Sequence, residues 1–263
     1  MADVFSTTFD FADWTQSDGL ADADIGVAGD GISGAGGWTT GLGAEDQVTA
    51  AANYSSGGGG KGFRHWVGDG LNNVGGSIQI TLPATESEIW IRYYIRFQSG
   101  FAWNGTIINM KTIYNTGTGT FYFGIFNNTV GGHVEADSDH GQGQGNHFST
   151  VSWSDWQGGS TGDGTFHCLE LHCKINPIGS VADGQFQFWL DDVELYNNTS
   201  VKFTTSDGVK FPGFKVGENS NDPQNGGVDV YVDFDDIVVS NSARVGPLAA
   251  ATVRRGSQMG GLG

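Results

Sequence analysis

The stretch from Glu88 to Phe97 alternates between two kinds of side chain. The even positions carry large polar or amphipathic groups, and the odd positions are almost entirely apolar. Successive side chains of a β-strand point to opposite faces, so this pattern predicts a strand with one face in a core. Its even face is a candidate functional surface, made of Trp90, Arg92, Tyr94 and Arg96.

Similar strand-like stretches recur along the chain. Turn-forming runs of Gly, Ser, Asn and Asp separate them, and no helical periodicity competes with them. One large domain of residues 1–246 with an all-β sandwich fold is expected. The predicted strands are 4–10, 62–67, 76–82, 88–98, 106–114, 120–126, 131–137, 165–175, 184–191, 193–197, 210–216 and 228–239.

The same alternation assigns polar faces to three further strands. In strand 106–114, Ile108, Met110 and Tyr114 are expected to point inward and Asn109 and Lys111 outward. If the strands are neighbours in a curved sheet, their polar faces merge into one groove. The predicted groove residues are Trp90, Arg92, Tyr94, Arg96, Asn109, Lys111, Glu170, His172, Lys174, Gln187 and Trp189.

Aromatic rings with amides and fixed charges suit a sugar chain, whose C–H faces stack on rings and whose hydroxyls form hydrogen bonds. The basic groups suit a uronate or sulfated glycan. A second reading stays open, because an exposed strand face must be polar in any case. In that reading a loop covers Trp90 and Tyr94, and the arginines pair with carboxylates.

Composition narrows the range of partners. The net charge of −17 repels nucleic acid and anionic membranes, and no apolar run is long enough to cross a bilayer. Neither nucleic acid nor a membrane is therefore an expected partner. Cys168 and Cys173 lie five positions apart on one predicted strand and on opposite faces, so a disulfide between them is not expected.

Four segments in order carry a family resemblance: residues 88–101 (EIWIRYYIRFQSGF), 162–176 (GDGTFHCLELHCKIN), 184–196 (GQFQFWLDDVELY) and 232–240 (VDFDDIVVS). They resemble the concanavalin A-like lectin/glucanase superfamily, and within it the jelly-roll polysaccharide lyases and related uncharacterised proteins. The resemblance implies a two-sheet antiparallel jelly-roll β-sandwich with a concave glycan groove. Because this superfamily mixes enzymes, lectins and structural domains, we expect a glycan-binding or surface-decorating module, with a polysaccharide lyase as the alternative.

A lyase must neutralise a uronate carboxylate, remove the C5 proton and protonate the leaving oxygen. The resemblance implies Arg92 or Arg96 with Asn109 for neutralisation, and His172, oriented by Glu170, or Tyr94 for proton transfer. Alginate lyases of this kind carry R-x-E-x-R and Q-[IV]-H, whereas residues 92–96 read RYYIR and Q-[IV]-H does not occur. This departure favours a binder over an enzyme.

Hydrolysis by a retaining mechanism is not expected, because that mechanism needs two closely spaced carboxyl groups. Jelly-roll glucanases carry them as E-x-D-x-x-E. In the nearest match here, Glu135 and Asp137 are followed by His140 where the second glutamate should stand.

The expected function requires no cofactor, and a structural calcium ion is the one metal considered. Asp236 has the apolar parity of Val232 and Phe234, so it should hydrogen-bond locally or help bind a cation. The resemblance implies a calcium ion where the first and last strands meet, with Asp10 as a second ligand.

Strand periodicity ends near Val245, and residues 247–263 are predicted to form a flexible arm. Glycan-groove folds act outside cells, yet the sequence shows no export signal. A virus or phage particle would resolve this conflict, because its proteins are made in the host cytoplasm and released by lysis. We therefore expect a virion or extracellular location, with the arm docked on a capsid or tail protein; a partial gene product that lost its signal is the alternative.

Overall fold

The computed structural model describes residues 3–34, 45–54, 60–67, 77–103, 109–115, 121–126, 133–138, 146–217, 220–221 and 230–248. Several strand residues, including Asn109, Tyr122, Glu135 and Asp137, are described by their backbone alone. The predicted arm from residue 249 onward, Ile108 and His140 lie outside the described residues.

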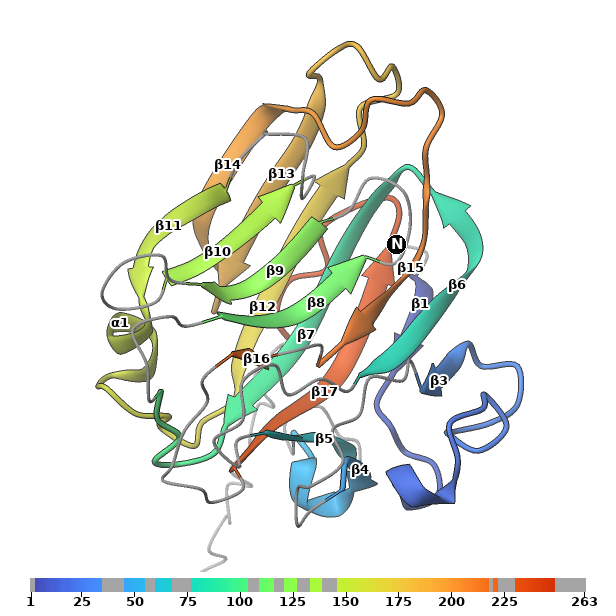
Figure 1. Ribbon diagram of the computed structural model, residues 1–263, viewed down its shortest axis with the longest axis vertical. Helices are drawn as coiled ribbons and strands as arrows, with labels where there is room; N and C mark the ends of the chain where they lie inside the picture. Colours follow the sequence, from blue (N-terminus) through green and yellow to red (C-terminus); the bar gives the residue numbers. More distant parts are fainter. Residues whose placement is uncertain are drawn as a thin grey trace, which may run out of the picture.

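Two antiparallel sheets form the molecule (Figure 1). The nine-stranded sheet, here called sheet A, has the order β14-β13-β12-β7-β17-β5-β4-β2, and β1 also pairs with β17. Its longest strands, β7 and β17, lie side by side at its centre. The strands are β1 (Asp3–Thr7), β2 (Trp14–Thr15), β4 (Gln47–Thr49), β5 (Gly62–Val67), β7 (Glu88–Phe97), β12 (His167–Lys174), β13 (Gly184–Leu190), β14 (Val193–Val201) and β17 (Val230–Ser240).

The eight-stranded sheet, here called sheet B, has the order β11-β10-β9-β8-β15-β6-β3, and β16 also pairs with β8. Both sheets therefore combine strands that are far apart in the sequence. The strands are β3 (Ile32–Gly34), β6 (Ile78–Glu86), β8 (Asn109–Asn115), β9 (Phe121–Phe126), β10 (His133–Ser138), β11 (Asn146–Ser152), β15 (Phe211–Val216) and β16 (Ser220–Asn221).

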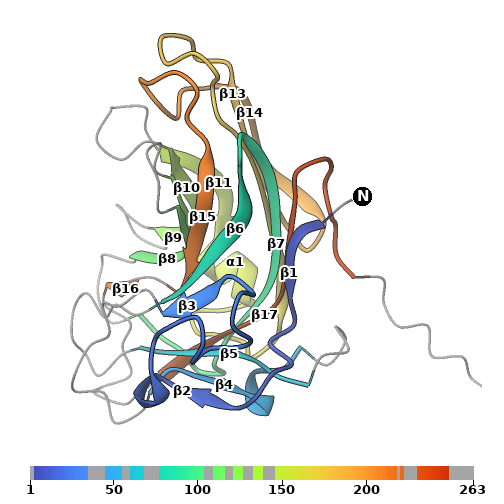
Figure 2. The same ribbon diagram turned by 90° about the vertical axis from the view of Figure 1, so that its right-hand side faces the viewer.

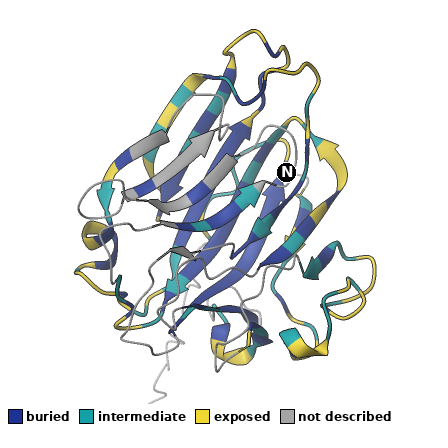
Figure 3. Ribbon diagram, viewed as in Figure 1, coloured by how far each residue is buried: buried dark blue, intermediate teal, exposed yellow. Residues whose placement is uncertain are grey.

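The inner faces of the two sheets form one apolar core. The odd positions of β7 are at most 1% exposed, as their parity predicts, and the central strands are buried along most of their length (Figure 3). Rings from opposite sheets meet there, since Phe123 of β9 lies 5.3 Å from Phe188 of β13 between centroids. The hydroxyl oxygens of Tyr93 and Thr112 lie 2.6 Å apart and link the sheets across the core. Burying each such side chain contributes about 1.5–3 kcal/mol, so the core is the main source of stability.

All predicted strands are present within the described residues, and the ends differ by a few positions. The alternation did not identify the short strands β2, β3, β4 and β16, nor β11. It also missed three short helices, η1 (Gln16–Asp18), η2 (Ala50–Ala52) and α1 (Trp153–Gln157). In α1, Ser152 and Asp155 form a capping box, and Trp153 and Trp156 pack on Phe97.

The outer faces of the two sheets lie on different sides of a bend in the molecule, and a segment of the chain runs along that of sheet A. In Figure 2, β6 of sheet B and β7 of sheet A bow toward the same side, so sheet A forms the outside of the bend. The segment that follows β17 runs along the outer side of sheet A.

None of the helices in the described part of the chain is long and apolar enough to cross a membrane.

Candidate functional site

The polar faces of three sheet A strands come together as the parity predicted. β12 lies between β7 and β13, and both pairings are antiparallel. In one row Glu170 lies between Arg92 and Trp189, and in the next His172 lies between Trp90 and Gln187. Register partners share a face, so these side chains lie on the outer face of sheet A.

Much of this face is covered by the chain itself. The carboxylate of Glu170 accepts hydrogen bonds from Arg244 Nε (3.0 Å), from the backbone N–H of Val245 (2.7 Å) and from that of Gly246. The hydroxyl of Tyr94 accepts one from the backbone N–H of Leu248 (2.8 Å). We call residues 241–248 the C-terminal strap. Since its bonds leave Glu170 only 1% exposed, the predicted groove is not open at this point.

Further contacts complete the cover at the same row. The guanidinium of Arg244 lies over the ring of Trp189, 4.6 Å from its centroid, and Trp189 is 7% exposed. Tyr54 stacks on Tyr94 with ring centroids 3.8 Å apart. Burial raises the pKa of Tyr94 well above its usual value, which does not suit proton transfer near neutral pH.

Arg92 is paired inside the molecule. Its Nη2 lies 2.6 Å from Asp236 Oδ1, and the residue is 2% exposed. Asp236 reaches the outer face through a bulge between Asp235 and Val238, where its φ is +50°. The prediction that Asp236 has the parity of the core residues is therefore wrong, whereas the alternative reading that a carboxylate holds Arg92 is confirmed.

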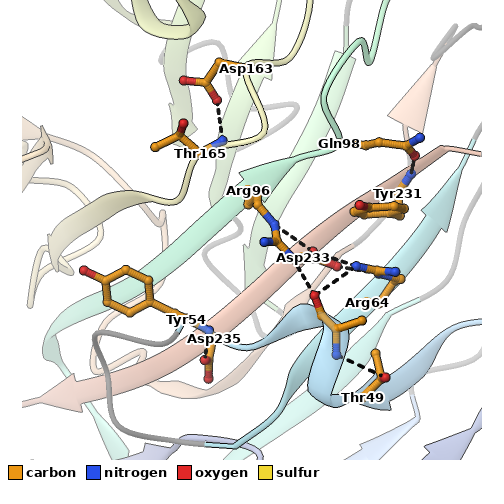
Figure 4. Close-up of polar contacts among 11 residues, drawn as sticks. Thr49, Tyr54, Arg64, Arg96, Gln98, Asp163, Thr165, Tyr231, Asp233 and Asp235 are labelled. Atoms are coloured by element: carbon orange, nitrogen blue, oxygen red, sulfur yellow. Dashed lines mark hydrogen bonds and ion pairs between the residues drawn. The ribbon is translucent and has the colours of Figure 1, made fainter.

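Arg96 takes part in a buried ion cluster (Figure 4). Asp233, with no exposed surface, accepts bonds from Arg96 Nε (3.0 Å) and Arg64 Nε (2.7 Å). The carbonyl oxygen of Ala51 in η2 accepts a bond from the Nη2 of each arginine. Gly62 permits this approach of η2, because an added Cβ would lie 2.2 Å from the oxygen of Ala52. The cluster thus joins β5, β7, β17 and η2.

His172 is held by groups other than the predicted Glu170. Its Nδ1 lies 2.8 Å from Gln187 Oε1 and its Nε2 3.0 Å from Glu88 Oε1. The predicted orientation by Glu170 is wrong, because the strap takes up that carboxylate. Lys174 is exposed, and its Nζ lies 3.5 Å from Glu88 Oε2. Ligand binding by the partly exposed members of this face stays a prediction.

Asn109 and Lys111 do not join this face. Both belong to β8 of sheet B, so the prediction of one groove that includes them is wrong. A bulge between Lys111 and Ile113 also changes the parity of β8. Thr112 and Ile113 are both buried, and Tyr114 is only partly buried, which corrects the prediction that Tyr114 points into the core.

Sheet B carries its own in-register row of polar positions. Each residue of the row pairs with the next across neighbouring strands, from β11 through β10, β9, β8, β15 and β6 to β3. A row across seven strands spans about 28 Å, since neighbouring strands lie about 4.7 Å apart, which is long enough for several sugar units. The row consists of Asn146, Asp137, Tyr122, Tyr114, Lys215, Gln79 and Ser33.

The described side chains place the centre of this row on the outer face of sheet B. Lys215 is partly exposed between the buried Phe214 and Val216, and its Nζ lies 5.6 Å from the centroid of the Tyr114 ring. Gln79 donates hydrogen bonds to the backbone oxygens of Ile80 (2.9 Å) and Phe214 (3.3 Å), which fix its amide. Lys111 is also partly exposed on β8.

The sequence contained part of the signal for this face. Lys215 interrupts an apolar strand, and the alternation in strand 106–114 predicts that Lys111 points outward. Gln79 and Tyr114 were missed, because the pairing of β15 with β6 and β8 cannot be read from local alternation.

The expected calcium ligands do not form a suitable site. Asp236 is neutralised by Arg92, while Asp10 is exposed and accepts bonds from the hydroxyl of Thr8 and the backbone N–H of Gly60. Burial raises the pKa of Asp235 to about 7, with smaller raising effects from Asp236 and Asp10. Among the described residues, no group of three or more His, Cys, Asp or Glu side chains could hold a metal ion. The donor set therefore does not fit calcium at Asp10 and Asp236.

Comparisons with known proteins identify the fold. No protein-family model matches the chain, and comparison with curated proteins gave no match. Among solved structures, a mutant of the alginate lyase Aly36B in complex with alginate tetrasaccharide matches with a TM-score of 0.60 and 18% identity, covering 91% of this chain and 97% of that one. The chain has a two-sheet antiparallel jelly-roll β-sandwich fold like that of this structure. The cellulose-induced protein Cip1 shares this jelly roll with a TM-score of 0.52 and 16% identity, covering 82% of this chain and 92% of Cip1.

Proposed function

We propose that the protein binds an acidic polysaccharide along the outer face of sheet B. The row from Asn146 to Ser33 is the observation that carries this proposal. It aligns hydroxyl, amide, ammonium and carboxyl residue types across the whole sheet, as a chain of hydroxylated sugars requires. This face also lies on the inside of the bend in Figure 2, opposite the face that the strap covers.

Two lysines give the face its preference for an acid. Lys111 lies in β8 and Lys215 in β15, and these two strands are neighbours in sheet B. An ammonium group binds a carboxylate through charge-assisted hydrogen bonds, which are stronger than neutral ones. The likeness to an alginate lyase in complex with alginate tetrasaccharide supports a uronate polysaccharide as the first ligand to test.

Cleavage of that polysaccharide by β-elimination is the second candidate function. It is favoured by the pairing of Lys215 with Tyr114 on one face, since β-elimination needs a neutralising cation and groups that transfer protons. The Aly36B protein seen with alginate tetrasaccharide carries alanine in place of one lysine and one tyrosine. In this chain we assign the cation to Lys111 or Lys215 and proton transfer to Tyr114.

Affinity electrophoresis in gels that contain alginate or polyglucuronate tests binding. We expect both polymers to retard the wild-type protein and Lys215→Ala or Lys111→Ala to weaken the apparent affinity about tenfold, the loss of one charge-assisted contact. Lys210→Ala is the matched control, because Lys210 is an exposed lysine outside sheet B. Equal retardation of all three variants would overturn the proposal.

Ultraviolet absorbance of the unsaturated sugar product separates the two candidate functions. A lyase should release this product from alginate or polyglucuronate, and Tyr114→Phe should abolish release while binding persists. Retention of the polymer without any product identifies a binder.

Decoration of a virus or phage particle, with the C-terminal arm docked on a capsid or tail protein, stays a prediction. It concerns residues outside the described part of the chain. Co-sedimentation of full-length protein with candidate particles, compared with a variant that lacks residues 249–263, tests it. Unchanged association of the shortened protein would argue against the arm as the docking element.

A further inference from the structure

A stacked pair of rings lies on the outer face of sheet A, beside the covered row. Trp90 of β7 is the register partner of His172 of β12. Their rings are parallel, with an interplanar angle of 4° and centroids 4.1 Å apart. His172 is 3% exposed, whereas Trp90 is only partly buried. Part of the indole is therefore open to solvent and is backed by a buried imidazole.

The imidazole gives this pair a fixed orientation. Both of its nitrogens have partners, Gln187 Oε1 at 2.8 Å and Glu88 Oε1 at 3.0 Å. The second oxygen of Glu88 lies 3.5 Å from Lys174 Nζ. The imidazole that supports the indole cannot rotate freely. Binding at the indole therefore costs little side-chain conformational entropy.

Further polar groups lie on the same face of sheet A, around the stacked pair of rings. Gln187 is partly exposed and donates through Nε2 to Glu194 Oε2 at 3.4 Å. Glu88 keeps 30% of its side chain exposed, and Glu194 and Lys174 are exposed. Two carboxylates stand beside one ammonium group, so the local charge disfavours an acidic sugar. A neutral sugar meets no such penalty, and its hydroxyls can bond with carboxylate and amide oxygens.

We propose that Trp90, backed by a His172 ring that Gln187 and Glu88 hold in place, binds a neutral glycan. The open part of the indole would carry the C–H face of a sugar, and Glu88, two positions away on β7 with 30% of its side chain exposed, would accept hydrogen bonds from the sugar hydroxyls. This site lies on the outer face of sheet A, whereas the acidic polysaccharide is assigned to the outer face of sheet B. The inference does not depend on the function proposed for sheet B.

Affinity electrophoresis in gels that contain hydroxyethylcellulose, laminarin or galactomannan tests the site. The wild-type protein should be retarded by at least one of these neutral polymers. Trp90→Ala should weaken the apparent affinity at least about tenfold, as expected for an aromatic anchor, and Trp90→Phe should keep part of it. Trp66→Ala is the matched control, because Trp66 is a partly buried tryptophan in β5 of the same sheet, packed on Tyr231.

Failure takes two forms, both distinct from failure of the sheet B proposal. No retardation of wild type in any neutral gel, or equal retardation of wild type and Trp90→Ala, overturns the site. Lys215→Ala should not change retardation by neutral polymers. If circular dichroism shows that Trp90→Ala is unfolded, Gln187→Ala and Glu88→Ala replace it. Each releases one nitrogen of His172 and should weaken binding, and unchanged binding in both overturns the proposal.

Discussion

At the scale of single residues, Asp233 makes Arg64 and Arg96 structural groups instead of ligands. It is fully buried and bonds to both Arg64 and Arg96. Removing one partner of a buried ion pair leaves an uncompensated charge, which costs about 3–5 kcal/mol. Asp233→Asn should therefore lower the free energy of unfolding by about 3 kcal/mol in urea denaturation. Asp183→Asn at an exposed position is the control, and equal stability of the two variants would contradict the cluster.

His167 makes part of the stability depend on pH. Burial lowers its pKa, but hydrogen bonds and charges from Asp191 and Asp163 outweigh that effect, so the pKa is raised above 6.5. The charged imidazole therefore stabilises the folded state fully at pH values below the pKa that His167 has in the unfolded chain. This contribution is lost as the pH rises through the higher pKa that His167 has in the folded protein. The gain is on the order of 1 kcal/mol or less, because half of the Asp191 side chain is exposed.

Comparison of wild type with His167→Gln measures this contribution. The difference in unfolding free energy should be largest near about pH 5 and should shrink toward about pH 9. A difference that stays constant over this range would show that His167 contributes by packing alone, for example through its edge contact with Trp156.

At the scale of elements, the C-terminal strap depends on Glu170. Its carboxylate accepts bonds from Arg244, Val245 and Gly246. Glu170→Gln removes the charge and places an amide donor against these donors. We therefore expect the free energy of unfolding to fall by about 2 kcal/mol. Hydrogen exchange should accelerate first at the amides of Val245, Gly246 and Leu248. Uniform acceleration over sheet A would contradict a local role, and Asp183→Asn again serves as the control.

Alternation predicted the long strands correctly because their buried side is continuous. It failed where a bulge changes the parity inside a strand, as at Asp236 in β17 and after Lys111 in β8. A bulge depends on pairing with a partner strand, which local sequence does not record. Short strands such as β2 and β4 carry too few residues to show a period.

At the scale of the whole molecule, strand adjacency explains which site predictions held. β12 and β13 are consecutive and β7 pairs with β12, so the rows of Trp90 and Arg92 formed as predicted. β8 instead pairs with β9 and with β15 in sheet B, which separates Lys111 from that face. The sequence also gave no sign that the C-terminal strap would cover Glu170. A single predicted groove thus became two outer faces with different chemistry.

The net charge of −17 makes the salt dependence of binding a test of the sheet B face. The overall field repels an acidic polysaccharide over a Debye length of about 30 Å at 10 mM salt, but only about 10 Å at 100 mM. The short contacts to Lys111 and Lys215 are screened less. We therefore expect the affinity for alginate, measured by calorimetry, to rise between these concentrations and to fall at higher salt. Binding of a neutral glycan should barely change. A steady fall from the lowest salt would mean that local attraction exceeds the repulsion of the whole molecule, and would contradict this balance.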